Sequence, residues 1–393
     1  MDAKNFNSKK LFLMSCVALI VTAISFALRA RLEPIFMNDY GLTATDIGLA
    51  FGPAFYGFTI SMILFGSFVD SWGMKKVLTM AFILHFIGIT GTIFSTGMWS
   101  LFFSTAAIGV GNGAIEAACN PLVASLYPKN KATMLNRFHV WFPGGIVIGS
   151  LLAYFMLDVI NLNWQVYVAV LYIPLVIYGF MFFKENFPQT ERVTSGVTTS
   201  EMWKSLLKPI FLFMAFCMLL TAVTELATQQ RISTLLADAN AVPMLVLALT
   251  TGLMALGRAF AGPVVHKLST SGMLLFSAVV AFIGLQMLSY SNGGMVYFSA
   301  AIFAVGVCFF WPTMLGFVAE EIPESGALGL SVIGGLGMFS VSIVLPIMGV
   351  FMDTGTQGSE TLRFMSILPA ILVVLFGFLY TKFGRKKKVQ INA

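Results

Sequence analysis

Three polar residues recur at a spacing of four inside an otherwise apolar stretch of this chain. They are Asn112, Glu116 and Asn120, and the stretch begins near Met98. A spacing of four places side chains on one face of an α-helix. A charged side chain at the centre of a membrane helix costs at least roughly 2.5–3.5 kcal/mol, so it usually faces a bundle interior or a water-filled cavity. The stripe therefore predicts a functional carboxyl group, with a structural polar network between helices as the alternative.

Two further acidic residues, Glu33 and Glu225, also lie in or beside apolar runs. A carrier driven by a proton gradient needs a group that changes charge during its cycle, and a buried carboxyl group can do so near neutral pH. We therefore expect Glu116 and Glu225, one in each half of the chain, to be proton-coupling candidates. Glu225 lies one turn before Gln229, and this polar face could accept hydrogen bonds from sugar hydroxyls and donate to them. The alternative for Gln229 is solvation at the outer mouth of the protein.

Arginines in apolar runs favour an anionic substrate rather than a neutral sugar. Guanidinium groups bind carboxylate and phosphate well, and the sequence offers Arg29, Arg31 and Arg258. Arg29 lies four residues before Glu33 and can pair with it on one helix face. Arg31 has no such neighbour, so it is the stronger indication of an anionic substrate. Either of these two arginines is also a possible salt-bridge partner for Glu225.

The aromatic and histidine candidates are His139, Trp141 and Trp311. Aromatic rings stack on sugar faces, but at membrane interfaces they more often form an interfacial belt. His139 could carry protons, with an ordinary hydrogen-bonded histidine as the alternative. Trp311 precedes Pro312, where a distorted helix could expose it to a cavity. We expect Asn112 and Asn120 to join the network of Glu116 and to contact the substrate.

Composition identifies the environment that positions these residues. The chain is 58% hydrophobic and 10% charged, whereas soluble domains carry about 25% charged residues. Apolar runs of about 20 residues predict twelve membrane-spanning α-helices. Their expected ranges are 11–32, 46–69, 77–94, 98–126, 134–157, 164–183, 210–235, 242–265, 273–290, 295–318, 328–352 and 364–380.

The twelve runs divide into two sets of six. We expect an all-α membrane protein with one bundle in residues 1–183, a cytoplasmic linker in 184–208 and a second bundle in 209–393. Gly-x-x-x-Asp70 ends the second run and Gly-x-x-x-His266 ends the eighth. Asn120-Pro121 and Trp311-Pro312 also occupy matching places, which favours two parallel repeats around a midplane site, a known transporter plan.

The distribution of charge indicates orientation and excludes several functions. Lys and Arg concentrate at both termini and after alternate helices, which predicts cytoplasmic termini. The net charge of +6 is explained by this pattern and does not indicate nucleic-acid binding. No phosphate-binding Gly-x-x-x-x-Gly-Lys-Ser/Thr motif occurs, so we expect neither an enzyme nor an ATP-driven pump. The four cysteines have no metal-ligand spacing, and we expect no metal and no cofactor.

The loop after the second run resembles the signature of the major facilitator superfamily, Gly-x-Leu-Ala-Asp-Arg-x-Gly-Arg-Lys-x-x-Leu. Gly66, Asp70, Gly73, Lys75 and Leu78 match it, while other positions depart from it. The resemblance implies the twelve-helix major facilitator fold. It also implies that Gly66, Asp70, Gly73 and Lys75 serve gating between the two halves rather than substrate choice.

The fourth run resembles a narrower group, the fucose–proton symporter family of sugar transporters. The shared pattern is Gly111-x-Gly113-x-x-Glu116-x-Ala118-x-Asn120-Pro121, followed by Pro128 and Leu135-Asn136. In that family the glutamate of this helix is implicated in proton coupling, so the resemblance assigns this role to Glu116. The family's second acidic residue lies in the first helix, where Glu33 is a loose match.

These features predict a secondary transporter that works by alternating access. The first hypothesis is proton-coupled symport of a small polar solute, above all a sugar, with H⁺ as the coupling ion and Na⁺ as the alternative. The second is a carrier of organic anions or sugar acids that uses the buried arginines. Drug export by proton antiport and a ligand sensor without transport are weaker alternatives. We expect a monomer in the cytoplasmic membrane of a bacterium, with membrane lipids around it and no nucleic-acid partner.

Overall fold

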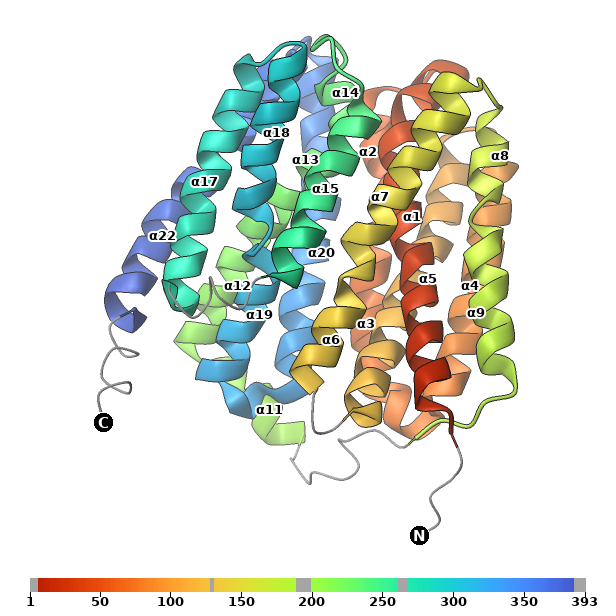
Figure 1. Ribbon diagram of the computed structural model, residues 1–393, viewed down its shortest axis with the longest axis vertical. Helices are drawn as coiled ribbons and strands as arrows, with labels where there is room; N and C mark the ends of the chain where they lie inside the picture. The colour runs from red at the N-terminus through yellow and green to blue at the C-terminus, as the bar shows by residue number, and fades with distance from the viewer. Residues whose placement is uncertain (1–5, 128–130, 189–198, 261–267, 385–393) are drawn as a thin grey trace. The chain divides into compact units, whose positions relative to one another are not determined.

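The computed structural model describes residues 6–127, 131–188, 199–260 and 268–384 of the chain. The side chain of Asp70 lies outside the described part. The chain divides into two compact units, Met1–Thr198 and Thr199–Ala393. Both are built from helices, and no strand occurs among the described residues (Figure 1).

The first unit contains nine α-helices and one π-helical segment in its described part. They are α1 (Ser8–Tyr40), α2 (Ala44–Phe51), α3 (Pro53–Trp72), α4 (Met74–Ile93), α5 (Met98–Leu126), α6 (Lys131–His139), α7 (Trp141–Ala153), η1 (Tyr154–Val159), α8 (Trp164–Ala169) and α9 (Tyr172–Phe183). In this unit α5 packs against both α3 and α4, and α1 lies beside α7 (Figure 1). This arrangement surrounds the polar stripe of α5 with other helices.

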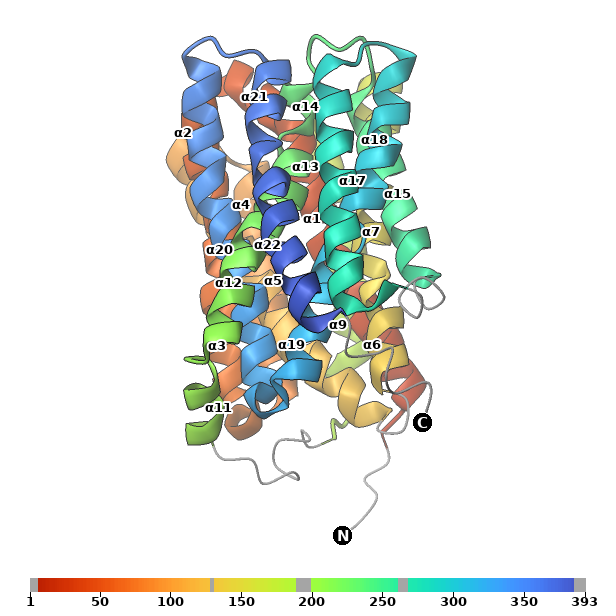
Figure 2. The same cartoon turned by 90° about the vertical axis from the view of Figure 1, so that its left-hand side faces the viewer.

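The second unit is described from α11 (Thr199–Ser205) onward. Its elements are α12 (Pro209–Ala222), η2 (Val223–Ala227), α13 (Thr228–Gln230), α14 (Ile232–Leu235), α15 (Pro243–Ala259), α17 (Thr270–Tyr290), α18 (Gly294–Val307), α19 (Phe310–Glu321), η3 (Pro323–Ser325), α20 (Gly326–Asp353), α21 (Gly358–Met365) and α22 (Ile367–Phe383). Here α17 packs against α18 and α22 (Figure 2), while α12 packs against α20.

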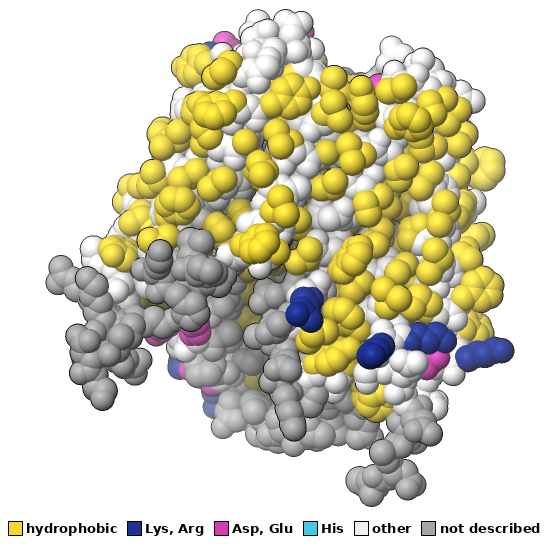
Figure 3. Space-filling model, viewed as in Figure 1, with side chains coloured by type: hydrophobic (Ala, Val, Ile, Leu, Met, Phe, Trp, Pro, Cys, Tyr) yellow, Lys and Arg dark blue, Asp and Glu magenta, His cyan; other side chains and the backbone are white. Residues whose placement is uncertain are grey.

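The membrane-spanning character predicted from composition is confirmed. The described residues form eleven helices that are long and apolar enough to cross a membrane. The eighth predicted run is represented by a shorter apolar helix, α15, and residues 261–267 beyond it fall outside the described part. Hydrophobic side chains cover the visible face, and Lys and Arg gather near the end where α1 begins (Figure 3).

The first helix is longer than predicted. We expected it to end at residue 32, before Pro34, but α1 continues through Pro34 to Tyr40. Proline deprives a helix of one hydrogen bond, and packing of the following turn outweighs that loss. Phe36 is buried, stacks on Tyr40 and meets the ring of Trp164 edge-on at 5.0 Å. The helix stops where Gly41 takes the left-handed conformation, with φ of 63°.

Two turns at helix ends show how the sequence sets the boundaries. Thr43 caps α2, because its side chain accepts from the Asp46 backbone N–H while the Asp46 carboxylate accepts from the Thr43 backbone N–H. We expected a seven-residue loop before residue 77. This prediction is wrong, because Gly73 alone separates α3 from α4. Gly73 has φ of 85°, a conformation that glycine adopts without steric cost.

Glycines allow α5 to approach its neighbours closely, as the spacing of Gly109 and Gly113 predicts. A Cβ atom on Gly109 would lie 2.6 Å from the carbonyl oxygens of Pro53 and Ala54 in α3, and one on Gly113 would meet the carbonyl oxygen of Phe58. These close contacts fix the rotation of α5 about its axis, and therefore the direction in which its polar residues point.

Candidate functional site

Glu116 lies in the interior of the first unit and belongs to a short chain of hydrogen bonds. Its Oε2 accepts a 2.7 Å bond from Asn120 Nδ2, and Asn120 Oδ1 lies 3.0 Å from His139 Nε2. Since the Asn120 amide nitrogen donates to Glu116, its oxygen must accept from the histidine ring. Glu116 is 8% exposed. In the described part of the chain its carboxyl group accepts this one amide hydrogen bond and makes no ion pair.

Asn112 does not belong to this chain, which corrects the expectation of one shared network. Successive positions four apart drift by about 40° around a helix of 3.6 residues per turn. This drift turns Asn112 toward α4 and α1. There its amide oxygen lies 2.9 Å from His85 Nε2, and its amide nitrogen donates to Ser25 Oγ at 3.3 Å.

The network of Asn112 is deeply buried and includes an arginine. His85 Nδ1 lies 3.2 Å from the hydroxyl of Tyr178 in α9. At the other end, Arg29 Nη1 approaches Ser25 Oγ at 3.5 Å. His85 and Tyr178 are 0% exposed, Ser25 is 1% and Asn112 is 2% exposed. His85 was not among the predicted site residues, although a lone histidine in an apolar helix is the signal that could have identified it.

Arg29 is buried between aromatic rings. It is 4% exposed, and its guanidinium carbon lies 5.3 Å from the centroid of Phe55 and 5.9 Å from that of Phe26. Such cation–π contacts stabilise a desolvated guanidinium group. Glu33, one turn further along α1, is also buried. In the first unit, α1 therefore supplies a buried cation, Arg29, and α5 supplies the buried carboxyl group of Glu116.

Arg31 is not the free cation that its sequence neighbourhood suggested. Its Nη2 lies 2.6 Å from Asp158 Oδ1 in η1, and both side chains are partly exposed. This ion pair could not be read from the sequence because the partners are 127 residues apart. Arg29 differs from Arg31 in being buried and in lying against two aromatic rings.

In the second unit, Arg258 connects two helix distortions. Its Nη2 lies 3.2 Å from Glu225 Oε1, and its Nε donates to the carbonyl oxygen of Cys308 at 2.9 Å. The salt bridge predicted as the alternative for Glu225 therefore exists, but the partner is Arg258 rather than Arg29 or Arg31. Glu225 lies in the π-helical segment η2, a form frequent at functional sites.

The oxygen that Arg258 binds is one that Pro312 leaves without a helical partner. In a regular helix the backbone N–H of residue 312 would donate to the carbonyl of residue 308, but proline has no N–H. The helical hydrogen bonds resume one residue later, from Thr313 to Phe309 at 3.1 Å. Arg258 satisfies the Cys308 carbonyl at this break. Glu225 Oε2 is buried and has no hydrogen-bond partner among the described residues.

The remaining predicted residues have mixed placements. Gln229 is buried rather than solvated, and its Nε2 lies 3.3 Å from Met254 Sδ. Trp311 packs against α20, where a Cβ atom on Gly337 would lie 3.0 Å from its ring. Trp141 begins α7 and is exposed. Of these three, Trp141 belongs to the first unit, while Gln229 and Trp311 belong to the second.

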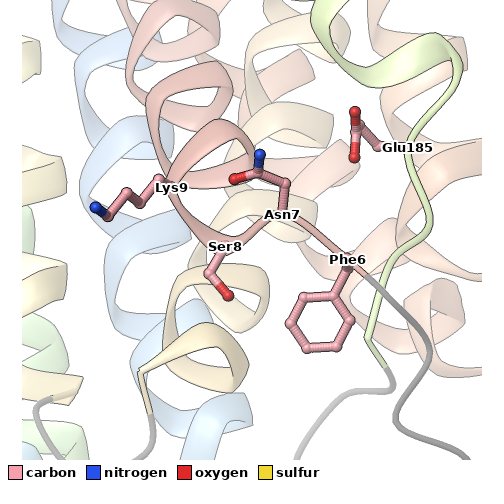
Figure 4. A pocket seen from close by; sticks show the side chains of 5 residues that line it. All are labelled: Phe6, Asn7, Ser8, Lys9 and Glu185. Carbon is pink, nitrogen blue, oxygen red and sulfur yellow. The ribbon is translucent and has the colours of Figure 1, made fainter.

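The gating-motif lysine takes part in a contact at the end of the first unit where α1 begins. Lys75 Nζ donates to the backbone carbonyl of Glu185 at 3.2 Å, and the carboxylate of Glu185 pairs with Lys10 at 2.7 Å. Glu185 lies across a surface hollow from the first turn of α1 (Figure 4). This contact connects the beginnings of α1 and α4 to the segment after α9. Among the described residues, nothing lies within 4 Å of a Cβ atom built on Gly66.

Comparison with known proteins agrees with this architecture. The family model described as Major Facilitator Superfamily matches residues 11–334. The chain is 25% identical over 153 residues to the hexuronate transporter of Bacillus subtilis, covering 38% of this chain and 36% of that protein. It is 28% identical over 108 residues to the D-xylose transporter of Levilactobacillus brevis, covering 25% of this chain and 24% of that protein. These matches span only about a quarter to a third of the relatives' length.

Solved structures share the fold over almost the whole chain. A D-xylose–proton symporter superposes with a TM-score of 0.76 at 15% identity, covering 94% of this chain and 97% of the other. The fucose–proton symporter of E. coli superposes with a TM-score of 0.64 at 15% identity, covering 93% and 98%. At 15% identity these superpositions show a shared fold. The match to the Major Facilitator Superfamily, a family of transporters, confirms the expectation that this chain is not an enzyme.

Proposed function

Because the chain belongs to the Major Facilitator Superfamily, we propose that it is a secondary transporter that moves a small polar solute by proton-coupled symport and alternating access. A sugar is the first candidate, and H⁺ is the coupling ion, with Na⁺ as the alternative. The protein works as a monomer in the cytoplasmic membrane of a bacterium, with both termini in the cytoplasm. Gly66, Asp70, Gly73 and Lys75, at the end of α3 and the start of α4, serve gating.

The observation that carries this proposal is the environment of Glu116. Its carboxyl group is buried, receives one amide hydrogen bond from Asn120 and has no ion pair among the described residues. A symporter needs such a group, because proton binding must change the charge inside the protein during the cycle. Glu225 differs, since its charge is paired with Arg258. Glu116 is therefore the proton-coupling residue, with His139 at the other end of its hydrogen-bond chain.

A sugar acid is the second candidate substrate, and Arg29 favours it. Its buried guanidinium group, placed between two aromatic rings, has the chemistry to bind a carboxylate. The relative named hexuronate transporter adds support from sequence. Neutral sugars and sugar acids share their hydroxyl groups, so both substrates can use the same hydrogen-bonding residues and differ only in their need for Arg29.

A binding screen and one pair of variants test the proposal. Purified protein is heated with D-xylose, L-fucose, D-glucuronate or the lipophilic cation tetraphenylphosphonium, since a ligand at a hundred times its Kd stabilises the folded state by about 2.7 kcal/mol. The ligand that stabilises the protein is then offered to proteoliposomes under a proton gradient. Glu116→Gln should abolish gradient-driven accumulation while sparing substrate exchange.

The matched control is Glu360→Gln, the same substitution at an exposed carboxylate on α21. It should transport like the unaltered protein. Accumulation by Glu116→Gln at the unaltered level would contradict the proton-coupling role. Stabilisation by tetraphenylphosphonium alone would favour drug export. Binding without any flux would favour a sensor.

A further inference from the structure

In the hydrogen-bonded chain that runs from Tyr178 to Arg29, one assignment of donors leaves no hydroxyl hydrogen without an acceptor. Ser25 has a single hydroxyl hydrogen and donates it to the carbonyl oxygen of Thr22 at 2.7 Å. Its oxygen must therefore accept from the two other groups that approach it, Asn112 Nδ2 at 3.3 Å and Arg29 Nη1 at 3.5 Å. The orientation of the Asn112 amide follows directly.

This orientation decides the state of the His85 ring. Asn112 turns its oxygen toward His85 Nε2 at 2.9 Å, so Nε2 carries the hydrogen. On the other side, Tyr178 is fully buried and His85 Nδ1 is the partner of its hydroxyl at 3.2 Å. The hydroxyl hydrogen is satisfied only if it points at an unprotonated Nδ1. A neutral His85 with its hydrogen on Nε2 satisfies every member of the chain.

The absence of a side chain at Gly111 leaves the space that the His85 ring occupies. A Cβ atom on Gly111 would lie 2.5 Å from His85 Cδ2 and 2.8 Å from Nε2. Real Cβ atoms do not approach so closely, so any larger residue at position 111 would displace the ring from Asn112. Four helices contribute to the chain: α9 through Tyr178, α4 through His85, α5 through Asn112 and α1 through Ser25.

We propose that His85, Asn112 and Ser25 are positioning residues, which hold the guanidinium group of Arg29 in place for a carboxylate of the substrate. A long arginine side chain has many rotamers, and restricting it before binding lowers the cost of binding. Ser25 contacts the guanidinium group directly, while Asn112 and His85 fix Ser25. This inference rests on the sugar-acid form of the proposed function.

The first test measures the chain itself without a substrate. The protein has three histidines, so labelling histidine with ¹⁵N gives three ring spin systems, and His85→Gln identifies one of them. We expect His85 to show the neutral form with hydrogen on Nε2. Ser25→Ala should shift the His85 ring signals, because Asn112 loses its acceptor, and should leave the other two histidines unchanged. The other neutral form, or no response to Ser25→Ala, would overturn the inference.

The second test measures binding of D-glucuronate. His85→Leu should raise the Kd about tenfold, the effect of one buried hydrogen bond. His85→Gln, which keeps a donor and an acceptor, should recover most of the affinity even if His85→Leu folds poorly. Gly111→Ala should weaken binding as well, whereas Gly144→Ala should not, because nothing lies within 4 Å of a Cβ atom at position 144.

The two proposals fail in distinguishable ways. If the unaltered protein does not bind D-glucuronate, the sugar-acid function is wrong and this inference falls with it. If the unaltered protein binds D-glucuronate and Arg29→Gln abolishes binding, but the His85 and Gly111 variants keep full affinity, only the positioning role is overturned.

Discussion

Arg258 donates a 2.9 Å hydrogen bond from Nε to the carbonyl oxygen of Cys308, fifty residues away in the chain. The bond replaces the one that a backbone N–H at position 312 would supply in a regular helix. The same guanidinium group pairs with Glu225, so one side chain holds α15, η2 and the break between α18 and α19 together. These contacts of Arg258 therefore stabilise the packing of the helices in the second unit.

We expect Arg258 and Pro312 to be energetically coupled. Pro312→Ala restores an N–H that can donate to the Cys308 carbonyl, which makes the bond from Arg258 partly redundant. Arg258→Lys, which keeps the charge beside Glu225 but loses Nε, should therefore cost less stability in the Pro312→Ala background than in the unaltered protein. The expected difference is about 1 kcal/mol, measured by a double-mutant cycle of unfolding in detergent. Additive effects would show that the two sites are independent.

Arg31 should matter little for substrate choice. It is paired with Asp158 and both side chains are partly exposed, and such surface pairs contribute roughly 0–1 kcal/mol. Arg31→Ala should change the melting temperature only slightly and leave the Kd for D-glucuronate unchanged. Arg29→Ala is the comparison, and it should weaken binding strongly. A selective loss of acid binding in Arg31→Ala would mean that the pair with Asp158 opens during transport.

The hydrogen-bond chain beyond Glu116 should influence proton coupling. Asn120→Leu removes the only donor to Glu116 among the described residues and also the acceptor of His139. We expect slower proton-driven accumulation, with substrate exchange affected less. His139→Gln keeps a donor toward Asn120 and should retain more of the accumulation. Equal activity of Asn120→Leu and the unaltered protein in both assays would show that Glu116 works without this chain.

The close approach of α5 and α3 gives a prediction about stability. Gly109→Ala should destabilise the protein by about 1–3 kcal/mol, because the added methyl group would overlap the carbonyl oxygens of α3. Gly144→Ala serves as the control in the same unit, since its Cβ atom meets open space and alanine favours helix formation. Thermal unfolding in detergent separates them. Equal melting temperatures would show that α3 moves aside at little cost.

The helices could be located from the sequence because lipid requires long apolar runs with all backbone groups bonded internally. The predicted fourth helix, residues 98–126, coincides with α5. The predicted helix ends were wrong where side-chain packing determines them. At Pro34 the helix continues, and two of the rings that Phe36 contacts, Phe51 and Trp164, are distant from it in the sequence. The prediction for Glu116 and Asn120 needed only helix periodicity. The partners of Arg31, Glu225 and His85 could not be predicted, because they come from other helices.

The π-helical segment in the second unit has a consequence for comparing this chain with others. Such a segment holds one extra residue per turn relative to an α-helix, so everything after it is rotated by about 100°. Gln229 and Gln230 lie in α13, the helix that follows η2. An ungapped alignment with a relative whose helix is regular here would therefore equate residues that face different directions. Placing a one-residue gap within 223–227 restores the correspondence, and it changes which glutamine inherits a role assigned in another transporter.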